Sequence, residues 1–206
     1  MTLWDSAPSI EQLGNFSFGI GPWLPATYEL SAEFAFDNLN KRRAAVVSTN
    51  AEWSLSVAAG FRKHFASLGG EVTTSVSTLP EESDFRSVLL RVLNTRPEVI
   101  YAPVTANLVP FFRQLRALGF GGPVVTSDNL TEELLVQSNG AFEGAYQTMV
   151  AAPDTKESRR LAVLYEKKFS RKPTMLAFHS WGYDGVRLMA EALRNSDLSR
   201  KSIRAV

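Results

Sequence analysis

Cysteine is absent from the 206-residue sequence, which excludes disulfide bonds, thiolate metal sites and cysteine nucleophiles. Histidine is scarce, and occurs only as His64 and His179. We interpret His64 as a solvated helix residue among charged neighbours, and His179 as half-buried packing beside aromatic residues. Because no cluster of carboxylates replaces the missing ligands, we predict neither a metal site nor a cofactor.

Long apolar runs are also missing. No stretch of about 18 apolar residues occurs, so we expect no membrane-spanning helix. Residues 1–5 lack the basic start and apolar core of a signal peptide, so either the mature protein is intracellular or an export signal lies outside this chain. The 22 basic and 21 acidic residues nearly balance, and we therefore expect no nucleic-acid partner.

Motifs for nucleotide binding or nucleophilic catalysis are absent as well. Gly19-Ile20-Gly21 is not a dinucleotide-binding fingerprint, because no third glycine follows at the right spacing and no helix begins there. The sequence has no phosphate-binding P-loop, no Gly-x-Ser-x-Gly elbow and no His-Glu-x-x-His. We predict no catalytic residues, and an enzyme of flavodoxin-like or Rossmann-like type is the least favoured alternative.

What the sequence does contain is a regular alternation of helical and strand-like periods between residues 25 and 150. Short apolar runs predict strands, and longer stretches with apolar residues three and four apart predict helices. The expected helices cover residues 27–39, 53–68, 84–93, 107–118 and 131–138. The expected strands cover residues 43–48, 71–77, 98–102, 123–127 and 144–150. This order predicts an α/β fold, in which helices cover both faces of a parallel sheet in three layers.

The two ends of the chain follow a different pattern. Residues 15–20 predict one lone strand, and residues 155–169 and 176–194 predict two amphipathic helices with no strand after them. In the longer helix, the residues expected to face inward are Trp181, Val186, Met189 and Leu193. We therefore predict a complete lobe at residues 25–150, with residues 1–24 and 151–206 as fragments of a second, similar lobe.

Ligands of open α/β sheets bind beyond the carboxyl ends of the strands. Here these ends are residues 48–53, 77–83, 103–106 and 128–129, which contain hydroxyls, amides, one aromatic ring and a carboxylate. Such a set suits a small polar molecule with a cationic or amide group. The carboxylate of Asp128 would accept a hydrogen bond from an ammonium, and the ring of Trp53 would cover a cation or an apolar tail.

Each of these residues also has a purely structural interpretation. Asp128 could equally be the N-cap of the helix that begins near Thr131. Trp53 could pack on the surface of the lobe, and Asn50 and Thr105 could cap the helices that follow them. We interpret Ser83 and Asp84 as caps alone, and these alternatives remain open at the level of sequence.

Short motifs that occur in a fixed order reveal a family resemblance. They are Thr49-Asn-Ala-Glu-Trp53, Leu68-Gly-Gly-Glu-Val72, Ser83-Asp-Phe85, Arg96-Pro-Glu-Val-Ile-Tyr101, Arg113-Gln-Leu-Arg-Ala-Leu-Gly119, Thr126-Ser-Asp128, Ala141-Phe-Glu-Gly144 and Trp181-Gly-Tyr-Asp-Gly-Val-Arg-Leu188. The stretch from residue 43 to about 195 resembles the type I periplasmic solute-binding proteins of the branched-chain amino-acid (Leu/Ile/Val) ABC transporter class.

The resemblance implies two lobes that close on a ligand about a hinge. It implies the substrate-binding component of an ABC-type importer, which binds an amino acid or similar small polar molecule without chemistry. The partner of the full-length protein would be the transporter permease, and its location would be periplasmic or extracellular if the full-length gene encodes a signal peptide. A ligand-sensing regulatory module of the same fold is the alternative.

The resemblance also assigns roles to individual residues. It implies that Trp53 covers the ligand, that Asp128 receives its ammonium, and that Val104 stands where a tyrosine often forms a second wall. A strand that often carries Phe-Arg reads Phe18-Gly19 here, so amides, urea-like molecules and aromatic acids remain candidate ligands. The predicted ligand-binding residues are Trp53, Asp128, Val104, Thr105, Asn50 and Asn129.

The first βαβ units of lobe one in this family have no counterpart in the sequence, so we expect a truncated chain. Half a cleft should bind its ligand weakly, because one wall can neither exclude water nor complete the hydrogen bonds. The exposed pieces of lobe one should also promote self-association.

Overall fold

The computed structural model describes residues 12–21, 24–127, 130–149 and 153–205. The chain divides into two compact units, of which one comprises residues 23–149 and the other combines residues 1–22 with 150–206. The interpretation of residues 25–150 as a complete lobe, with residues 1–24 and 151–206 as fragments of a second one, stays a prediction.

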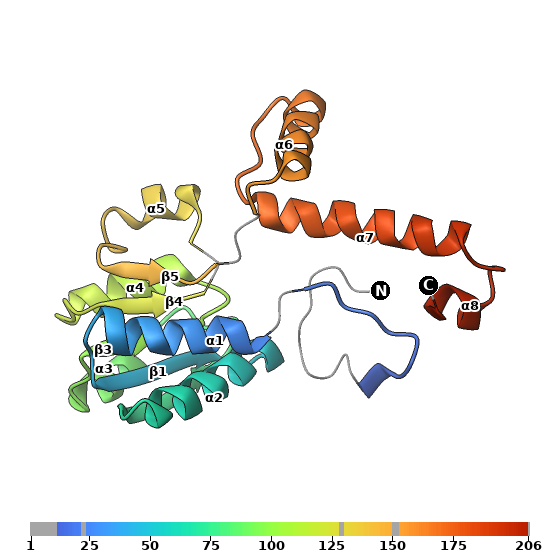
Figure 1. Ribbon diagram of the computed structural model, residues 1–206. Coiled ribbons are helices and arrows are strands. Elements are labelled where there is room, and N and C mark those ends of the chain that lie inside the picture. The colour runs from blue at the N-terminus through green and yellow to red at the C-terminus, as the bar shows by residue number, and fades with distance from the viewer. Residues whose placement is uncertain (1–11, 22–23, 128–129, 150–152, 206) are drawn as a thin grey trace. The chain divides into compact units, whose positions relative to one another are not determined.

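The larger unit contains a five-stranded sheet in the order β2-β1-β3-β4-β5 (Figure 1). All four pairs of neighbouring strands are parallel, which confirms the predicted α/β fold class. The strands are β1 (Arg43–Thr49), β2 (Glu71–Thr78), β3 (Val99–Tyr101), β4 (Val124–Thr126) and β5 (Ala145–Gln147).

Helices alternate with these strands in the order that the sequence predicts. They are α1 (Leu24–Glu33), η2 (Phe34–Asn38), α2 (Glu52–Ser67), α3 (Arg86–Asn94), α4 (Leu108–Ala117) and α5 (Glu132–Ser138). The single helix expected at residues 27–39 is instead an α-helix that continues as a short π-helix, where the backbone N–H of Leu39 donates to the carbonyl of Phe34. This wider turn cannot be recognised from apolar spacing, because it changes the period over only a few residues.

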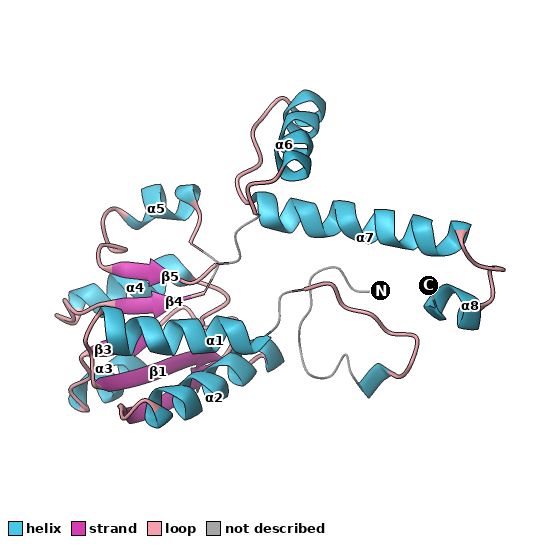
Figure 2. Cartoon of the chain, in the orientation of Figure 1, coloured by secondary structure: helices cyan, strands magenta, loops and turns pink. Residues whose placement is uncertain are grey.

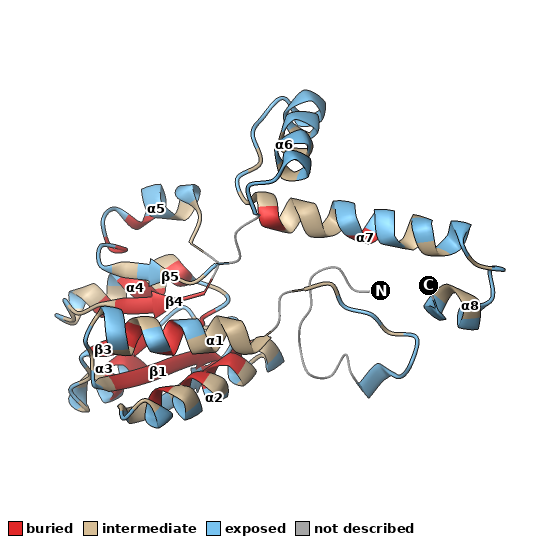
Figure 3. Ribbon diagram, viewed as in Figure 1, coloured by how far each residue is buried: buried red, intermediate tan, exposed pale blue. Residues whose placement is uncertain are grey.

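Two hydrophobic clusters lie on opposite faces of the sheet, because successive residues of a strand point to opposite sides. Ile100 belongs to the cluster with the α3 and α4 side chains, whereas Tyr101 belongs to the cluster with α1 and α2. In Figure 3 the buried residues follow the strands and the helix faces that cover them. Burial on both faces explains why β1, β3 and β4 contain continuous apolar runs rather than alternating ones.

Glycines end two of the covering helices. Gly69 follows α2 with a φ of +96°, and Gly119 follows α4 with a φ of +89°. The left-handed conformation is accessible to glycine without a steric penalty, and this confirms the helix ends predicted at these positions.

The smaller unit is helical in the part that the structure describes (Figure 2). Its helices are α6 (Lys156–Phe169), α7 (Leu176–Arg194) and α8 (Arg200–Ala205). The lone strand expected at residues 15–20 is wrong, since only Gly19 forms an isolated bridge there. A strand needs neighbours to pair with, and the described residues of this unit contain no sheet.

The inward face predicted for α7 is only partly correct. Trp181 and Met189 are half-buried, but Val186 is 65% exposed and Leu193 is 41% exposed. Within its unit α7 contacts α6 and α8, and these short helices do not cover its full length. No helix in the described ranges is long and apolar enough to cross a membrane.

Candidate ligand-binding site

The carboxyl ends of the parallel strands meet at one edge of the sheet, and buried hydroxyl groups gather there. Ser48 and Thr49 end β1, Thr78 ends β2, and Thr126 and Ser127 end or follow β4. The hydroxyl of Thr126 donates to the carbonyl of Ala102 at 2.7 Å. The strand ends therefore form a polar but uncharged floor.

A network centred on Ser54 connects the loops after β1 and β3. The Ser54 hydroxyl accepts a hydrogen bond from the backbone N–H of Thr49 at 2.9 Å and donates to the carbonyl of Pro103 at 2.5 Å. The hydroxyl of Thr49 in turn accepts from the backbone N–H of Thr105 at 3.0 Å. Because Ser54 is fully buried, these bonds are shielded from water and hold the two loops in fixed positions.

Three of the predicted site residues lie on these connected loops or directly after them. Asn50 is exposed, and its backbone N–H donates to the carbonyl of Thr78 at 2.7 Å. Thr105 is exposed as well, and Trp53 is half-buried as the second residue of α2. The structure thus brings Asn50, Trp53 and Thr105 to one edge of the sheet.

The other three predicted residues are either buried or outside the described part of the chain. Val104 is 1% exposed and packs in the cluster with α3 and α4, so its side chain is the least accessible of the described candidates. Asp128 and Asn129 lie outside the described residues. Their ligand contacts stay predictions, as do those of the residues above.

The alternative capping roles of several candidates are wrong. The N-cap of α2 is Ala51 rather than Asn50, and that of α4 is Asn107 rather than Thr105. The N-cap of α5 is Thr131, whose hydroxyl accepts from the backbone N–H of Leu134 at 3.3 Å. The capping role considered for Asp128 is therefore already filled.

Asp84 does bind the first turn of α3, although the N-cap residue of that helix is Phe85. Its carboxylate accepts from the backbone N–H of Arg86 at 3.2 Å and from the guanidinium of the same residue at 2.7 and 2.6 Å. The hydrogen bonds from Arg86 lower the pKa of the Asp84 carboxyl to about 2. The Asp84 carboxylate thus remains charged at neutral pH, but it already accepts hydrogen bonds from Arg86.

The described loops at this edge carry acidic but no basic side chains. Glu52 begins α2, and Glu81 and Glu82 follow β2, whereas residues 50–54, 79–85 and 102–107 contain neither lysine nor arginine. A wall of hydroxyls and carboxylates favours a ligand group that donates hydrogen bonds or carries positive charge.

Neither histidine belongs to the strand-end loops. His64 is half-buried rather than solvated, since its Nε2 lies 3.2 Å from a carboxylate oxygen of Glu33 where α1 packs on α2. His179 is half-buried and packs against the ring of Tyr165 at a centroid distance of 4.4 Å, as expected. In the described ranges, no group of three His, Cys, Asp or Glu residues is arranged to bind a metal.

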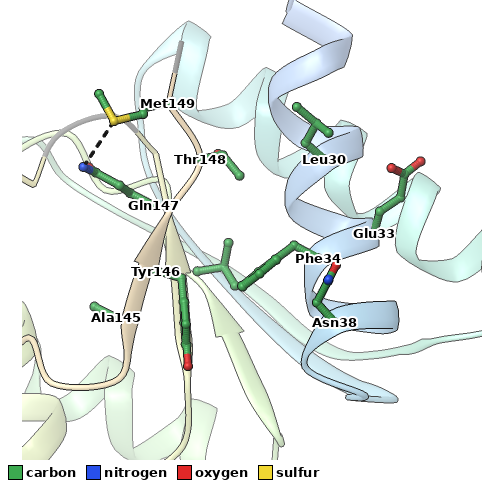
Figure 4. Close-up of a pocket in the computed structure, with 10 residues that line it drawn as sticks. Leu30, Glu33, Phe34, Asn38, Ala145, Tyr146, Gln147, Thr148 and Met149 are labelled. Carbon is green, nitrogen blue, oxygen red and sulfur yellow. Dashed lines mark hydrogen bonds between the residues drawn. The ribbon is translucent and has the colours of Figure 1, made fainter. Parts of the chain in front are cut away.

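A hollow that no sequence motif indicated lies between α1, η2 and β5 (Figure 4). Its volume is about 650 Å³. The rings of Phe34 and Tyr146 meet there at a centroid distance of 5.1 Å, and the exposed apolar side chains of Leu30 and Met149 border it. The hollow lies beside β5, a strand at the edge of the sheet.

Comparison with known proteins decides the family. A family model described as periplasmic binding protein matches residues 5–206, nearly the whole chain. The chain belongs to the periplasmic binding protein family. The resemblance stated from the short motifs is thereby confirmed. No curated protein matches the sequence.

Solved structures show the same fold. A putative branched-chain amino acid ABC transporter from Rhodospirillum rubrum is 25% identical with a TM-score of 0.73, and the match covers 96% of this chain and 58% of that one. A branched-chain amino acid transporter substrate-binding protein from Streptococcus pneumoniae, in complex with isoleucine, is 18% identical with a TM-score of 0.77 and coverages of 94% and 56%.

A solute-binding protein of an ABC transporter from R. palustris, in complex with 4-hydroxybenzoate, is also 18% identical. Its TM-score is 0.83, and the match covers 98% of this chain and 57% of that one. The chain thus spans slightly more than half the length of these proteins.

Proposed function

We propose that this chain is part of the substrate-binding component of an ABC-type importer, which holds an amino acid or a similar small polar molecule without changing it chemically. Membership of the periplasmic binding protein family supports this proposal, as do structural neighbours that carry isoleucine or 4-hydroxybenzoate. The ligand would lie against the strand-end edge of the larger unit, in a cleft completed by the rest of a longer protein.

The observation that carries the proposal is the buried Ser54 network. It holds the loops of Asn50 and Thr105 in place before any ligand arrives, so less conformational entropy is lost on binding. In the proposed complex the Trp53 ring covers the ligand, while Asn50, Thr105 and Asn129 supply hydrogen bonds. Val104 supports the wall from behind.

Asp128 is proposed to receive the ammonium of the ligand. The acidic and hydroxyl character of the described loops supports an amino acid over an aromatic acid such as a benzoate, because these loops offer no cation to a carboxylate. The carboxylate would then be bound by the part of the longer protein that faces this edge. That protein would work in the periplasm or outside the cell, with the transporter permease as its partner.

Ligand titration tests the proposal. Tryptophan fluorescence and calorimetry would be recorded with a panel of amino acids and with 4-hydroxybenzoate, on the 206-residue chain and on a longer gene product that contains it. We expect binding of an amino acid that is tight in the longer protein and weak in this chain. Asp128→Asn should abolish it, whereas Trp181→Phe in the smaller unit should not.

Two outcomes would count against this assignment. Failure of the longer protein to bind any compound of the panel would exclude amino acids as ligands. Binding of 4-hydroxybenzoate with an affinity that Asp128→Asn does not change would contradict the proposed role of Asp128 in binding an ammonium group.

A further inference from the structure

The second segment of the smaller unit, residues 150–206, contains a local excess of positive charge. Residues 156–172 contain seven basic and two acidic side chains, a net charge of +5, although the whole chain carries only +1. All seven basic side chains are exposed. Such a concentration of one sign attracts anionic partners over a distance comparable to the Debye length.

Most of this charge lies on α6, and three of the cations form a stripe along it. At about 100° per residue, Lys156, Arg160 and Lys167 fall within an arc of about 40°. Val163 lies about 20° outside this arc, on the side of Lys156, and is 65% exposed. We call these four residues the basic stripe, and Leu164, which is 43% exposed, borders it.

The basic stripe faces away from the helix on which α6 packs. Leu161 and Tyr165 lie on the opposite side of α6 and are half-buried, and the ring of Tyr165 contacts His179 of α7. Packing within the unit therefore uses the other face of α6, and leaves the stripe to solvent.

The cations of the stripe also form no ion pair with the residues that the structure describes. Arg159, on the flank, pairs with Asp154 at 2.8 Å. Among the residues that the structure describes, the ion pairs do not include Lys156, Arg160 or Lys167. An exposed valine between three unpaired cations has no evident role in folding.

We propose that the basic stripe is a docking surface for an anionic lipid bilayer. The cations would meet the phosphate groups of the lipids, and Val163 and Leu164 would enter the boundary between headgroups and acyl chains. A straight helix of about 21 Å presents these groups on a convex surface, which suits a flat partner. An acidic polypeptide or a nucleic acid would pair with the cations but offers no apolar layer to the two aliphatic side chains.

Vesicle binding tests this proposal independently of ligand binding. The full chain would be sedimented with vesicles of phosphatidylcholine alone, and with vesicles that also contain phosphatidylglycerol, at low and at high salt. We expect binding only to the anionic vesicles, and its loss at high salt. The double variant R160Q/K167Q should lower the partition coefficient roughly 30-fold, at about tenfold per 1.4 kcal/mol and about 1 kcal/mol per cation.

A matched control is available on α2 of the other unit, where Arg62 and Lys63 are also exposed. R62Q/K63Q removes the same charge and should leave vesicle binding unchanged, whereas Val163→Asn should weaken it without removing any charge. Circular dichroism would measure the helix content of each variant. If a variant of the stripe loses helix content, Lys156→Gln takes its place in the experiment.

Three results would overturn the proposal. The first is no preference for anionic vesicles, and the second is a loss of binding in the control variant as strong as in R160Q/K167Q. The third is capture of the chain by immobilised polyglutamate through the same stripe while the vesicles leave it in solution, which would make the partner an acidic polypeptide.

Discussion

Among individual residues, Ser54 illustrates how a side chain without any sequence signal can organise a site. In the sequence it is one of several small residues at the start of a helix. In the structure its hydroxyl satisfies the backbone N–H of Thr49 and the carbonyl of Pro103, both in a buried environment. Such bonds connect residues far apart in sequence, and local pattern cannot reveal them.

Ser54→Ala should therefore reduce the free energy of unfolding by about 1–3 kcal/mol, because it leaves two buried polar groups unpaired. Urea denaturation measures the change. Ser67→Ala on the same helix is the control, since Ser67 is exposed and bonds only to the carbonyl of His64, and it should cost much less. Equal losses for both variants would show that the Ser54 network adds nothing specific.

Asp84 allows a pH prediction at the same scale. Hydrogen bonds from Arg86 lower the pKa of the Asp84 carboxyl to about 2. The contact should therefore stabilise the folded state fully above pH 3.8, the ordinary aspartate pKa, and this stabilisation should be lost as the pH falls toward 2. NMR titration of the Asp84 carboxyl should give a midpoint near 2, and in Arg86→Gln a midpoint closer to 3.8. A midpoint that does not move in this variant would contradict the assigned cause.

Between elements, Arg116 connects α4 to the turns that precede β4 and β5. Its guanidinium donates to the carbonyls of Phe120, Gly122, Ala141 and Glu143. Burial lowers the pKa of Arg116, but its partners are carbonyl oxygens, which a planar fork of donors can reach together. The sequence motif around this residue predicted the family and gave no hint of this role.

Arg116→Lys should consequently destabilise the larger unit by about 2 kcal/mol, because an ammonium cannot reach all four carbonyls. Arg113→Lys, which changes a neighbouring exposed arginine with one such bond, should cost less. Thermal unfolding of the two variants side by side makes the comparison. If the two melting temperatures fall equally, the carbonyl cluster is not what Arg116 contributes.

For the whole molecule, the exposed apolar surface of the smaller unit leads to a prediction about assembly. Val186 is 65% exposed and Leu188 is 56% exposed on α7. We expect concentration-dependent self-association in sedimentation velocity, because burial of these side chains in a second copy removes apolar surface from water. V186K/L188Q should shift the equilibrium toward the monomer.

Val136 on α5 of the larger unit provides the control for this experiment. Its side chain is 82% exposed, so Val136→Lys removes an exposed apolar group and adds the same charge elsewhere. Association that responds equally to both changes would reflect net charge rather than the α7 surface, and a strictly monomeric wild-type chain would exclude association at the concentrations used.

The sequence by itself determined the order of elements in the larger unit, the parallel sheet and the family. These follow from local information: apolar period distinguishes helix from strand, and Gly69 and Gly119 end helices through their own backbone freedom. The position of the candidate site at the strand ends followed as well, since it depends only on the direction of parallel strands.

Only the tertiary structure decided which residues at that edge are buried or hydrogen-bonded and which are exposed to solvent. It placed Ser54 at the centre of the loop network and Val104 in the core, and it showed that Thr131 caps α5. It also exposed Val186, which a helical period alone predicts to be buried. Period shows which side of an element is apolar, but burial and hydrogen bonding depend on what packs against that side, and this is fixed by residues distant in the chain.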